Sequence, residues 1–396
     1  MGEVVERITR KNENLESTLP LTISAQYGLI NQNEFFDKRI ASKDVSGYFL
    51  VRNGEFAYNK STSSDAPWGA IKRLDRYESG VLSTLYIVFK ISDERKTSSD
   101  YIVTYYNTDL WHKGIQAIAA EGARNHGLLN IAPADFFETN LTMPKDYAEQ
   151  QQIGSFFQQL DHLITLHQRK YDKLQVLKKA MLEKMFPKNG SSVPEIRFKG
   201  FTDAWEQRKL GDMMNVTSVK RIHQSDWTDS GVRFLRARDI VAAAKNEEPD
   251  DYLYISKEKY EEYSALSGKV GVSDLLVTGV GTIGVPYLVR NLEPLYFKDG
   301  NIIWFQNSDK IDGKFLFYSF SAEQIQGFIN ESAGIGTVGT YTIESGKKTP
   351  ISLPNQIEQA KVGEFFQQLD NLITLHQREL EKLQNIKKSM LEKMFV

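Results

Sequence analysis

Residues 149–186, EQQQIGSFFQQLDHLITLHQRKYDKLQVLKKAMLEKMF, return at residues 358–395 as EQAKVGEFFQQLDNLITLHQRELEKLQNIKKSMLEKMF, with 27 of 38 positions identical. The residues that precede the two copies do not resemble one another. The chain is therefore built twice, each time from a variable segment followed by a constant one. Such a duplication suits a molecule that holds two different binding domains at a fixed separation.

The repeated segment predicts a long amphipathic helix, because its apolar residues recur at spacings of three and four. At a rise of 1.5 Å per residue, such a helix is about 55 Å long. A helix with one apolar stripe needs another helix to cover it, and the nearest candidate is its own duplicate. Antiparallel pairing of the two copies would give the molecule a pseudo-twofold axis, whereas parallel dimerisation with a second chain is the alternative. The residues that we expect at this coiled-coil or partner interface are Phe156, Phe157, Leu160, Leu163, Leu174 and Met181 in the first copy, and Phe365, Phe366, Leu369, Leu372, Leu383 and Met390 in the second.

The repeat divides the 396 residues into five parts. We expect an α+β protein, in which two mixed α/β domains are separated by a long antiparallel two-helix coiled coil. The predicted parts are the first variable domain at 1–147, the first constant helix at 148–186, a linker and lead-in at 187–210, the second variable domain at 211–357 and the second constant helix at 358–396.

Local patterns predict several elements inside the variable domains. Asn53-Gly54 within residues 47–58 predicts a β-hairpin, and the β-branched and aromatic run 81–91 predicts one buried strand. Residues 111–122 predict a helix that ends at Gly122. In the second domain we expect strands at 232–235, 275–278, 287–289 and 302–305, and a helix at 314–329.

Composition excludes several classes of protein. The absence of cysteine rules out disulfides and cysteine-ligated metal sites, and it fits a reducing compartment. Residues 1–16 carry no apolar run of a targeting peptide, and no run of about 18 apolar residues could span a membrane. We therefore expect a cytoplasmic protein with no membrane partner. The net charge of −2 does not favour binding of nucleic acid by overall charge, although a local basic face is compatible with it.

The sequence holds no catalytic constellation. It lacks the glycine–lysine pattern of an ATP-binding loop, and its six histidines show no metal-ligand spacing. Gly279–Gly284 (GVGTIG) matches the G-x-G-x-x-G pattern of dinucleotide or S-adenosylmethionine loops. Residues 285–289 then continue as a strand, so no helix N-terminus faces a phosphate. A glycine-rich turn between strands, which lets another backbone come close, is the favoured interpretation.

Basic and small polar residues cluster in both variable domains. Arginine and asparagine read base edges through paired hydrogen bonds, whereas lysine, serine and threonine mostly hold phosphates. Each cluster taken alone also fits an ordinary solvated surface. The candidate DNA-binding residues are Asn59, Lys60, Ser61, Lys72 and Arg73 in the first domain, and Lys220, Arg221, Arg236, Arg238 and Lys298 in the second.

Three sequence features together carry a resemblance to a known family. They are the pattern FFQQLD-x-LITLHQR in both repeats, the lead-in FTDAWEQRKLG at residues 201–211, and a proline followed closely by Glu-Gln before each repeat. Over essentially the whole chain, the sequence resembles the specificity subunit of a type I restriction–modification system. The resemblance implies a non-catalytic DNA reader, in which each variable domain is a target-recognition domain for one half of a bipartite, asymmetric site. The two helices would pair antiparallel and set the spacer between the half-sites. Residues 279–284 and 334–341 would be loops near DNA, which adds Thr278, Thr282, Thr337 and Tyr341 to the candidates.

The resemblance also implies partners. Two methyltransferase (modification) subunits would dock on the helices and domains and methylate adenine in double-stranded DNA. Two restriction subunits would join for cleavage in systems that carry them. S-adenosylmethionine, ATP and Mg²⁺ are then expected on these subunits, and no cofactor or metal on this chain. The first domain lacks the lead-in, which we expect before Met1 in longer relatives.

Two other functions remain open from the sequence. Helical rods that present two protein-binding domains would make the chain a structural adaptor, and sequence-specific DNA binding would distinguish a DNA reader from it. A methyltransferase in its own right is suggested by the glycine-rich loop alone, and would require that the isolated chain binds S-adenosylmethionine.

Overall fold

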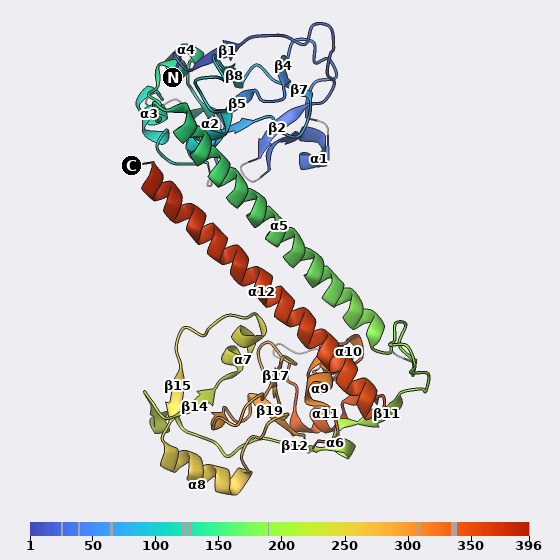
Figure 1. The fold of residues 1–396 in the computed structure, drawn as a ribbon. Coiled ribbons are helices and arrows are strands. Elements are labelled where there is room, and N and C mark those ends of the chain that lie inside the picture. The colour runs from blue at the N-terminus through green and yellow to red at the C-terminus, as the bar shows by residue number, and fades with distance from the viewer. Residues whose placement is uncertain are drawn as a thin grey trace. The chain divides into compact units, whose positions relative to one another are not determined.

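The computed structural model describes residues 1–24, 27–38, 40–63, 66–119, 124–125, 128–188, 190–307, 309–333 and 339–395. The chain divides into two compact units, of which unit 1 comprises Met1–Leu166 with Leu380–Val396 and unit 2 comprises His167–Glu379. Each unit therefore contains one globular part and a section of each long helix (Figure 1).

Unit 1 is organised around an antiparallel sheet in the order β1-β8-β5-β6. Successive side chains of a strand point to opposite faces. Phe56 and Tyr58 therefore pack with α-helices on one face, and Ala57 packs against the smaller sheets on the other. The strands are β1 (Val5–Ile8), β2 (Leu21–Ser24), β3 (Gly28–Asn31), β4 (Phe49–Arg52), β5 (Phe56–Asn59), β6 (Ala70–Arg73), β7 (Ser79–Leu82), β8 (Ile87–Ile91), β9 (Arg124–Asn125) and β10 (Leu128–Leu129). The helices are α1 (Gln32–Phe36), α2 (Ser99–Tyr105), α3 (His112–Ile118), α4 (Pro133–Glu138) and the first section of α5 (Tyr147–Met185).

The hairpin predicted at Asn53-Gly54 is wrong. Gly54 does form a turn, with a φ of 83°, but β4 pairs with β7 whereas β5 pairs with β6 and β8. The side chain of Glu55 accepts the backbone N–H of Arg52 at 2.7 Å and the guanidinium of Arg10 at 2.7 Å. This half-buried network directs the chain from one sheet into another. Turn residues specify the bend, whereas packing decides which strands pair.

Two other predictions for the first domain also need correction. The run 81–91 forms two strands, because β7 ends at Leu82 and β8 begins at Ile87 after a turn. Both strands contribute to one apolar core cluster, so apolar content alone did not reveal the break. The helix predicted at 111–122 is α3, which ends at Ile118, and Gly122 lies outside the described residues.

Unit 2 repeats the framework sheet of unit 1, since its strands are antiparallel in the order β12-β19-β16-β17. It adds a second sheet in the order β13-β15-β14-β18, and β11 pairs with β20. The strands are β11 (Glu206–Lys209), β12 (Asn215–Thr217), β13 (Trp227–Thr228), β14 (Val232–Leu235), β15 (Leu253–Ile255), β16 (Leu275–Thr278), β17 (Pro286–Leu288), β18 (Leu295–Phe297), β19 (Ile302–Gln306) and β20 (Pro350–Leu353). The helices are α6 (Leu210–Met213), the 3-10 turn Gln224–Asp226, α7 (Ala237–Ala244), α8 (Lys257–Ser267), α9 (Gly313–Ser319), α10 (Glu323–Ser332), α11 (Ile343–Lys348) and sections of α5 and α12 (Gln356–Met394).

The strand predictions for the second domain are largely confirmed. β14 and β16 have the predicted bounds. β17 is shifted by one residue from the predicted 287–289, and β19 extends one residue beyond the predicted 302–305. The single helix predicted at 314–329 is two helices, α9 and α10. The chain leaves α9 at Phe320 and reaches an extended conformation at Ala322, with a ψ of 153°, before α10 begins.

In unit 2, α5 and α12 run antiparallel to each other. His167 of α5 lies against His376 of α12, with their Nδ1 atoms 3.2 Å apart. Further along α5, Lys178 pairs with Asp370 at 2.6 Å. Residue numbers thus rise on one helix as they fall on the other, and the antiparallel pairing predicted from the repeat is confirmed.

The helix sections of unit 1 pair in the same way. Asp161 of α5 binds Lys387 of α12 at 2.6 Å, and Phe157 packs on Phe395. Asp161 and Lys387 are the repeat equivalents of the two partners that form the ion pair in unit 2. None of the helices in the described part of the chain combines the length and apolar character that a membrane-spanning segment requires.

The same glutamine anchors the start of each long helix. In unit 1, the buried Gln150 donates to the carbonyl of Pro144 at 2.9 Å and accepts the N–H of the N-cap residue of α2 at 2.9 Å. In unit 2, Gln359 donates to the carbonyl of Pro354 at 2.8 Å and accepts the N–H of the N-cap residue of α9 at 3.0 Å. These contacts fix which residues of the two units correspond.

Candidate nucleic-acid interface

Candidates from both domains lie at equivalent places in the framework sheet. Asn59 ends β5 and Thr278 ends β16, and these strands hold the same position in their sheets. The next residues correspond as well, because the carbonyl of Lys60 accepts a backbone N–H from β10 at 2.9 Å and that of Gly279 accepts the N–H of Tyr341 at 2.8 Å. Residue type suggested Asn59 and Lys60, and the family resemblance suggested Thr278, whereas the fold places the two segments at one common position.

Three basic candidates of the second domain meet at a hollow of about 390 Å³. β14 and β18 are parallel neighbours, so their C-terminal ends lie at the same edge of the sheet. The N–H of Lys298 donates to the carbonyl of Leu235 at 2.8 Å, which fixes Lys298 beside the residues that follow β14. The lining residues are Gln224, Trp227, Arg236, Ala237, Arg238, Lys298 and Asn301.

Arg236 belongs to the frame of this hollow. Its guanidinium donates to Asp239 at 2.8 Å and to Asp251 at 2.9 Å, and the Asp239 carboxylate also accepts the backbone N–H of Arg236 at 2.8 Å. Burial disfavours the charge, yet these bonds raise the pKa of the guanidinium above its usual value. Its side chain is only 14% exposed. Contrary to the prediction that it reads bases, Arg236 is engaged within the protein, where its guanidinium holds Asp239 and Asp251 and the Asp239 carboxylate caps the start of α7.

Arg238 and Arg221 present their cations to solvent. Their side chains are 62% and 67% exposed, and Lys220 is exposed as well. Arg221 shares Asp299 with Lys298, at 2.8 and 4.0 Å. The Asp299 side chain is only 12% exposed, so this carboxylate holds the two cations at the protein surface. These four cations are the DNA-binding candidates that the structure leaves accessible in the second domain.

The glycine-rich turn Gly279–Gly284 joins the antiparallel strands β16 and β17, as predicted. A Cβ atom at Gly279 would lie 2.7 Å from the carbonyl oxygen of Tyr341. Such a contact is too short for any side chain, so the close approach of the second backbone requires glycine. The turn is a packing device, and the cofactor interpretation of its pattern has no support in its geometry.

The threonine and tyrosine candidates near this turn differ in whether they are buried or exposed. Thr278 is fully buried, and its hydroxyl donates to the carbonyl of Thr282 at 2.6 Å. Tyr341 is also buried, and burial raises the pKa of its hydroxyl. Contrary to the prediction, Thr278 and Tyr341 build the turn and do not face solvent, whereas Thr282 is exposed at its tip. Thr337 lies outside the described residues.

Two basic candidates of the first domain, Lys72 and Arg73, are engaged inside the protein. Lys72 donates to the side chain of Asn107 at 2.8 Å, and burial lowers the pKa of its ammonium. Arg73 binds Asp75 at 2.6 Å and Asp100 at 2.8 Å, and its side chain is 13% exposed. Their predicted contact with DNA is therefore corrected to an internal structural role.

The remaining candidates of the first domain lie at its surface. The side chain of Asn59 accepts the N–H of Ser61 at 3.0 Å and shapes the turn after β5. Ser61 is exposed. Among the described residues, Lys60 donates to the carbonyl of Ile131 at 3.4 Å, and partial burial lowers the pKa of its ammonium. A weakly held lysine beside a polar turn is suited to a phosphate.

The helix candidates fall into two groups. Phe157, Leu160, Phe366 and Leu369 are buried, and Leu174, Met181, Phe365 and Leu383 are partly buried against the core clusters. In contrast, the side chains that remain 37–44% exposed are Phe156, Leu163, Leu372 and Met390. Leu166 and Leu375, which are repeat equivalents, are exposed by 38% and 51%. The apolar stripe of each helix is thus wider than one antiparallel partner covers.

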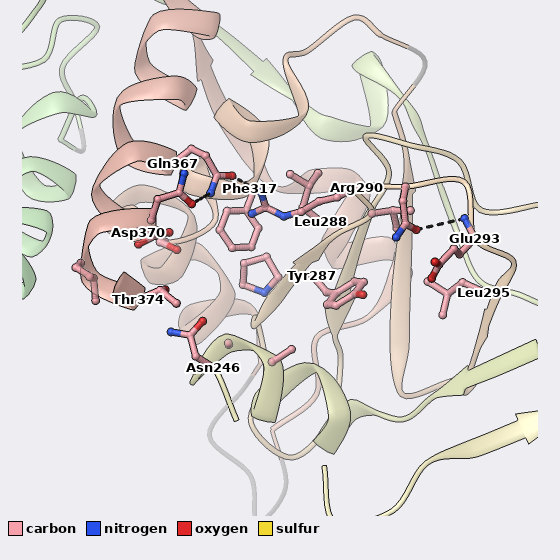
Figure 2. A pocket seen from close by; sticks show the side chains of 18 of the residues that line it. Asn246, Tyr287, Leu288, Arg290, Glu293, Leu295, Phe317, Gln367, Asp370 and Thr374 are labelled. Carbon is pink, nitrogen blue, oxygen red and sulfur yellow. Dashed lines mark hydrogen bonds between the residues drawn. The ribbon is translucent and has the colours of Figure 1, made fainter. Parts of the chain in front are cut away.

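A larger cavity, of about 570 Å³, lies in unit 2 beside α12 (Figure 2). The guanidinium of Arg290 lies over the ring of Phe317, 5.8 Å from its centre, and donates to Gln367 of α12. Asp370 binds Lys178 at 2.6 Å. The bond from Arg290 to Gln367 ties α12 to the globular part of unit 2, and the pair Lys178–Asp370 ties α12 to α5. Over the described ranges, no cluster of three or more metal-ligating side chains occurs.

Sequence reasoning missed several residues of the smaller hollow. Gln224, Trp227 and Asn301 line it beside Arg238. The indole N–H of Trp227 is buried and has no acceptor within the described residues. An aromatic ring and two amides beside an arginine supply both stacking and hydrogen bonding to a base. No spacing or motif in the sequence marks them, since Gln224 and Trp227 lie in a 3-10 turn and the strand after it, whereas Asn301 lies far along the chain, just before β19.

Comparison with known proteins gives one consistent result. The model of the type I restriction modification DNA specificity domain matches residues 202–385. The type I restriction enzyme MjaVIII specificity subunit of Methanocaldococcus jannaschii is 25% identical over 328 residues, which cover 79% of this chain and 72% of that protein. A putative type I restriction enzyme specificity subunit of Haemophilus influenzae is 29% identical over 171 residues, which cover 42% of this chain and 41% of that protein.

The fold has a matching solved structure. The crystal structure of a type I restriction–modification S subunit from M. genitalium superposes with a TM-score of 0.60 at 14% identity, and covers 99% of this chain and 94% of that one. At this identity the match shows a shared fold, which agrees with the antiparallel helices and the two globular parts described above. Residues 202–385 therefore carry a type I restriction modification DNA specificity domain, and over 79% of its length the chain is similar to a specificity subunit of a type I restriction–modification system.

Proposed function

We propose that this chain recognises a bipartite, asymmetric DNA site and directs adenine methylation to it. The observation that carries the proposal is the duplication of a constant helix behind two domains that share a framework sheet and differ elsewhere. Unit 2 adds the β13-β15-β14-β18 sheet, and unit 1 has two-stranded pairs in its place. Two domains with the same framework sheet but different additional sheets would recognise two different half-sites.

In the second domain, we infer that DNA meets the edge formed by the ends of β14 and β18. This edge lies on the added sheet, where Arg238 and Lys298 are accessible and Trp227 and Asn301 line the same hollow. Arg238 would contact a base edge, and Lys298 and Arg221 would hold phosphates. In the first domain, the turn at Asn59–Ser61 would make the equivalent contact with DNA.

The length of the constant helices would set the gap between the half-sites. Each helix has 39 residues, which corresponds to about 58 Å at 1.5 Å per residue and exceeds one DNA turn of about 34 Å. Inserting about four residues, one helical turn, into both helices should lengthen the unspecified gap and leave both half-sites unchanged. Changed half-sites with a constant gap would contradict this account.

The exposed leucines of the helices support docking of partner subunits. Leu163 and Leu166 of α5, and their equivalents Leu372 and Leu375 of α12, remain 38–51% exposed. Two methyltransferase subunits, one for each repeat, would cover these surfaces with their own helices, and restriction subunits would join the complex for cleavage. S-adenosylmethionine, ATP and Mg²⁺ would bind to those subunits, and this chain would direct them to the DNA sequence.

The experiment that tests the function is a genome-wide methylation map of cells that express this chain with its neighbouring methyltransferase subunit. Cells without the chain are the control. We expect a new adenine motif, with two short specific halves around a fixed gap. Replacing the variable segment 211–348 by that of another specificity subunit should change one half and keep the other. Unchanged methylation, with neither a complex with the methyltransferase nor sequence-specific DNA binding, would refute the proposal in favour of a structural adaptor.

A further inference from the structure

In unit 2, the hollow at the ends of β14 and β18 places two side-chain amides beside the guanidinium of Arg238. The amides belong to Gln224 and Asn301, and within the described residues neither of them forms a hydrogen bond to another group of the protein. Arg238 binds Asp251, but both of these side chains are more than half exposed. All three lining side chains therefore keep hydrogen-bonding groups that a ligand can use.

The backbone of Asn301 is held in place by the framework sheet. Its carbonyl accepts the N–H of Gly279 at 2.7 Å. The next residue, Ile302, begins β19 and pairs with Thr278 of β16. A side chain that is unbonded but starts from a fixed backbone is suited to selecting one partner, because little further freedom is lost when it binds.

The other two side chains also start from capped elements. In the 3-10 turn that carries Gln224, the N–H of His223 donates to the carboxylate of Asp226 at 3.2 Å. Arg238 lies in the first turn of α7, which the carboxylate of Asp239 caps. The fold thus directs one guanidinium and two amides into a single hollow from three fixed positions.

The amides favour a base over a phosphate as the ligand of this hollow. A phosphate only accepts hydrogen bonds, so it would leave the carbonyl oxygen of an amide without a donor. The major-groove edge of adenine offers the donor N6 beside the acceptor N7, which matches an asparagine or glutamine amide. The edge of guanine offers the acceptors O6 and N7, which match the guanidinium of arginine. The hollow therefore carries the groups that recognise both purines.

We propose that Arg238 reads a guanine and Asn301 reads an adenine, so that the half-site of unit 2 contains a G·C pair and an A·T pair at these positions. Asn301 is assigned in preference to Gln224 because Gln224 is the more exposed of the two and lies outside the framework sheet. The inference rests on the proposed function and names the bases that this one domain selects.

The adenine that Asn301 reads differs from the adenine that is methylated. A methyltransferase takes its target base out of the stack and into its own pocket before it reacts. Asn301 holds N6 and N7 in the major groove, which requires its adenine to stay in the duplex. The half-site of unit 2 therefore contains a second A·T pair besides the methylated one.

The test uses the full chain in complex with its neighbouring methyltransferase subunit and starts from the methylation map. The half-site of unit 2 is the half that changes when segment 211–348 is replaced. Each unmethylated adenine of this half is then exchanged in turn for 7-deazaadenine, which lacks only the N7 acceptor. At one position, the exchange should weaken binding of the unaltered complex about tenfold, as measured by fluorescence anisotropy. Asn301→Ala should weaken binding of the normal duplex by a similar factor and should be insensitive to that exchange.

Further variants separate a contact with DNA from a structural role. Asn301→Asp keeps the shape of the side chain but loses the N–H donor, so it should bind as weakly as Asn301→Ala does. Arg238→Ala and 7-deazaguanine form the corresponding pair for the guanine. Asn330→Ala, which removes an exposed amide on α10, is the matched control and should leave the site and the affinity unchanged. Calorimetry checks that each variant keeps the melting temperature of the parent chain.

Two results would overturn the inference. One is a half-site of unit 2 that lacks a guanine or a second A·T pair. The other is a 7-deazaadenine effect that is the same in the unaltered and the Asn301→Ala complexes at every position, because another group would then make the contact. Either result leaves bipartite recognition standing, whereas the absence of any new methylation motif would refute the proposed function itself.

Discussion

The replacement Arg197→Ala tests how much a single buried ion pair contributes to unit 2. Glu358 is 0% exposed, and Arg197 is its ion-pair partner, with an 11% exposed side chain and two hydrogen bonds of 2.6 and 2.7 Å. Removing one partner of a buried pair leaves an uncompensated charge and costs about 3–5 kcal/mol. For a unit of this size, 1 kcal/mol shifts the melting temperature by about 2–4 °C. We therefore expect the transition of unit 2 to fall by about 6–20 °C.

The repeat supplies a matched control for this prediction. Glu149 occupies the same place in unit 1 but is exposed, so Glu149→Gln should change stability by about 0.5 kcal/mol at most. Differential scanning calorimetry of the full chain measures both variants. The pair Arg197→Met with Glu358→Met should recover most of the loss, because no unpaired charge remains buried. Equal shifts for Arg197→Ala and Glu149→Gln would refute the reasoning.

Three further predictions follow from the same structure. Arg238→Ala should weaken binding to one half-site by about 1–3 kcal/mol with little change in melting temperature. Arg236→Ala should lower the melting temperature, because it removes the guanidinium that pairs with Asp239 and Asp251. Fluorescence anisotropy with specific DNA and calorimetry separate the two. Leu163→Asn with Leu372→Asn should abolish co-purification with the methyltransferase subunit and leave the isolated chain equally stable, since both side chains are exposed. Burial, the facing His167 and Lys170 lower the pKa of His376, so the folded protein favours its neutral form. The contribution of His376 to stability should therefore be present above the unfolded pKa of about 6.5, and lost as the pH falls below it. Urea titrations from pH 5 to 8 should show that His376→Gln flattens this dependence, and an unchanged slope would contradict the assignment.

The sequence by itself determined the organisation of the molecule. A nearly identical repeat with an apolar stripe can bury that stripe only against another helix, so the two long helices and their need for a helical partner were predictable. The stripe alone left parallel pairing with a second chain as the alternative to antiparallel pairing. Four strands of the second domain were predictable as well, because each is a short apolar run bounded by turn residues. The prediction that a strand and not a helix follows the glycine-rich turn is confirmed, since β17 begins at Pro286.

Only the tertiary structure decided which residues face solvent and which strands pair. The turn at Gly54 was evident, but its two flanking strands joined different sheets through Glu55 and Arg10. Burial then removed Lys72, Arg73, Arg236, Thr278 and Tyr341 from the accessible candidates for the DNA interface. Residue type shows that a side chain can bind a phosphate or a base. Whether it is free to do so depends on carboxylates and backbone groups that are distant in sequence, and these meet only when the sheets assemble.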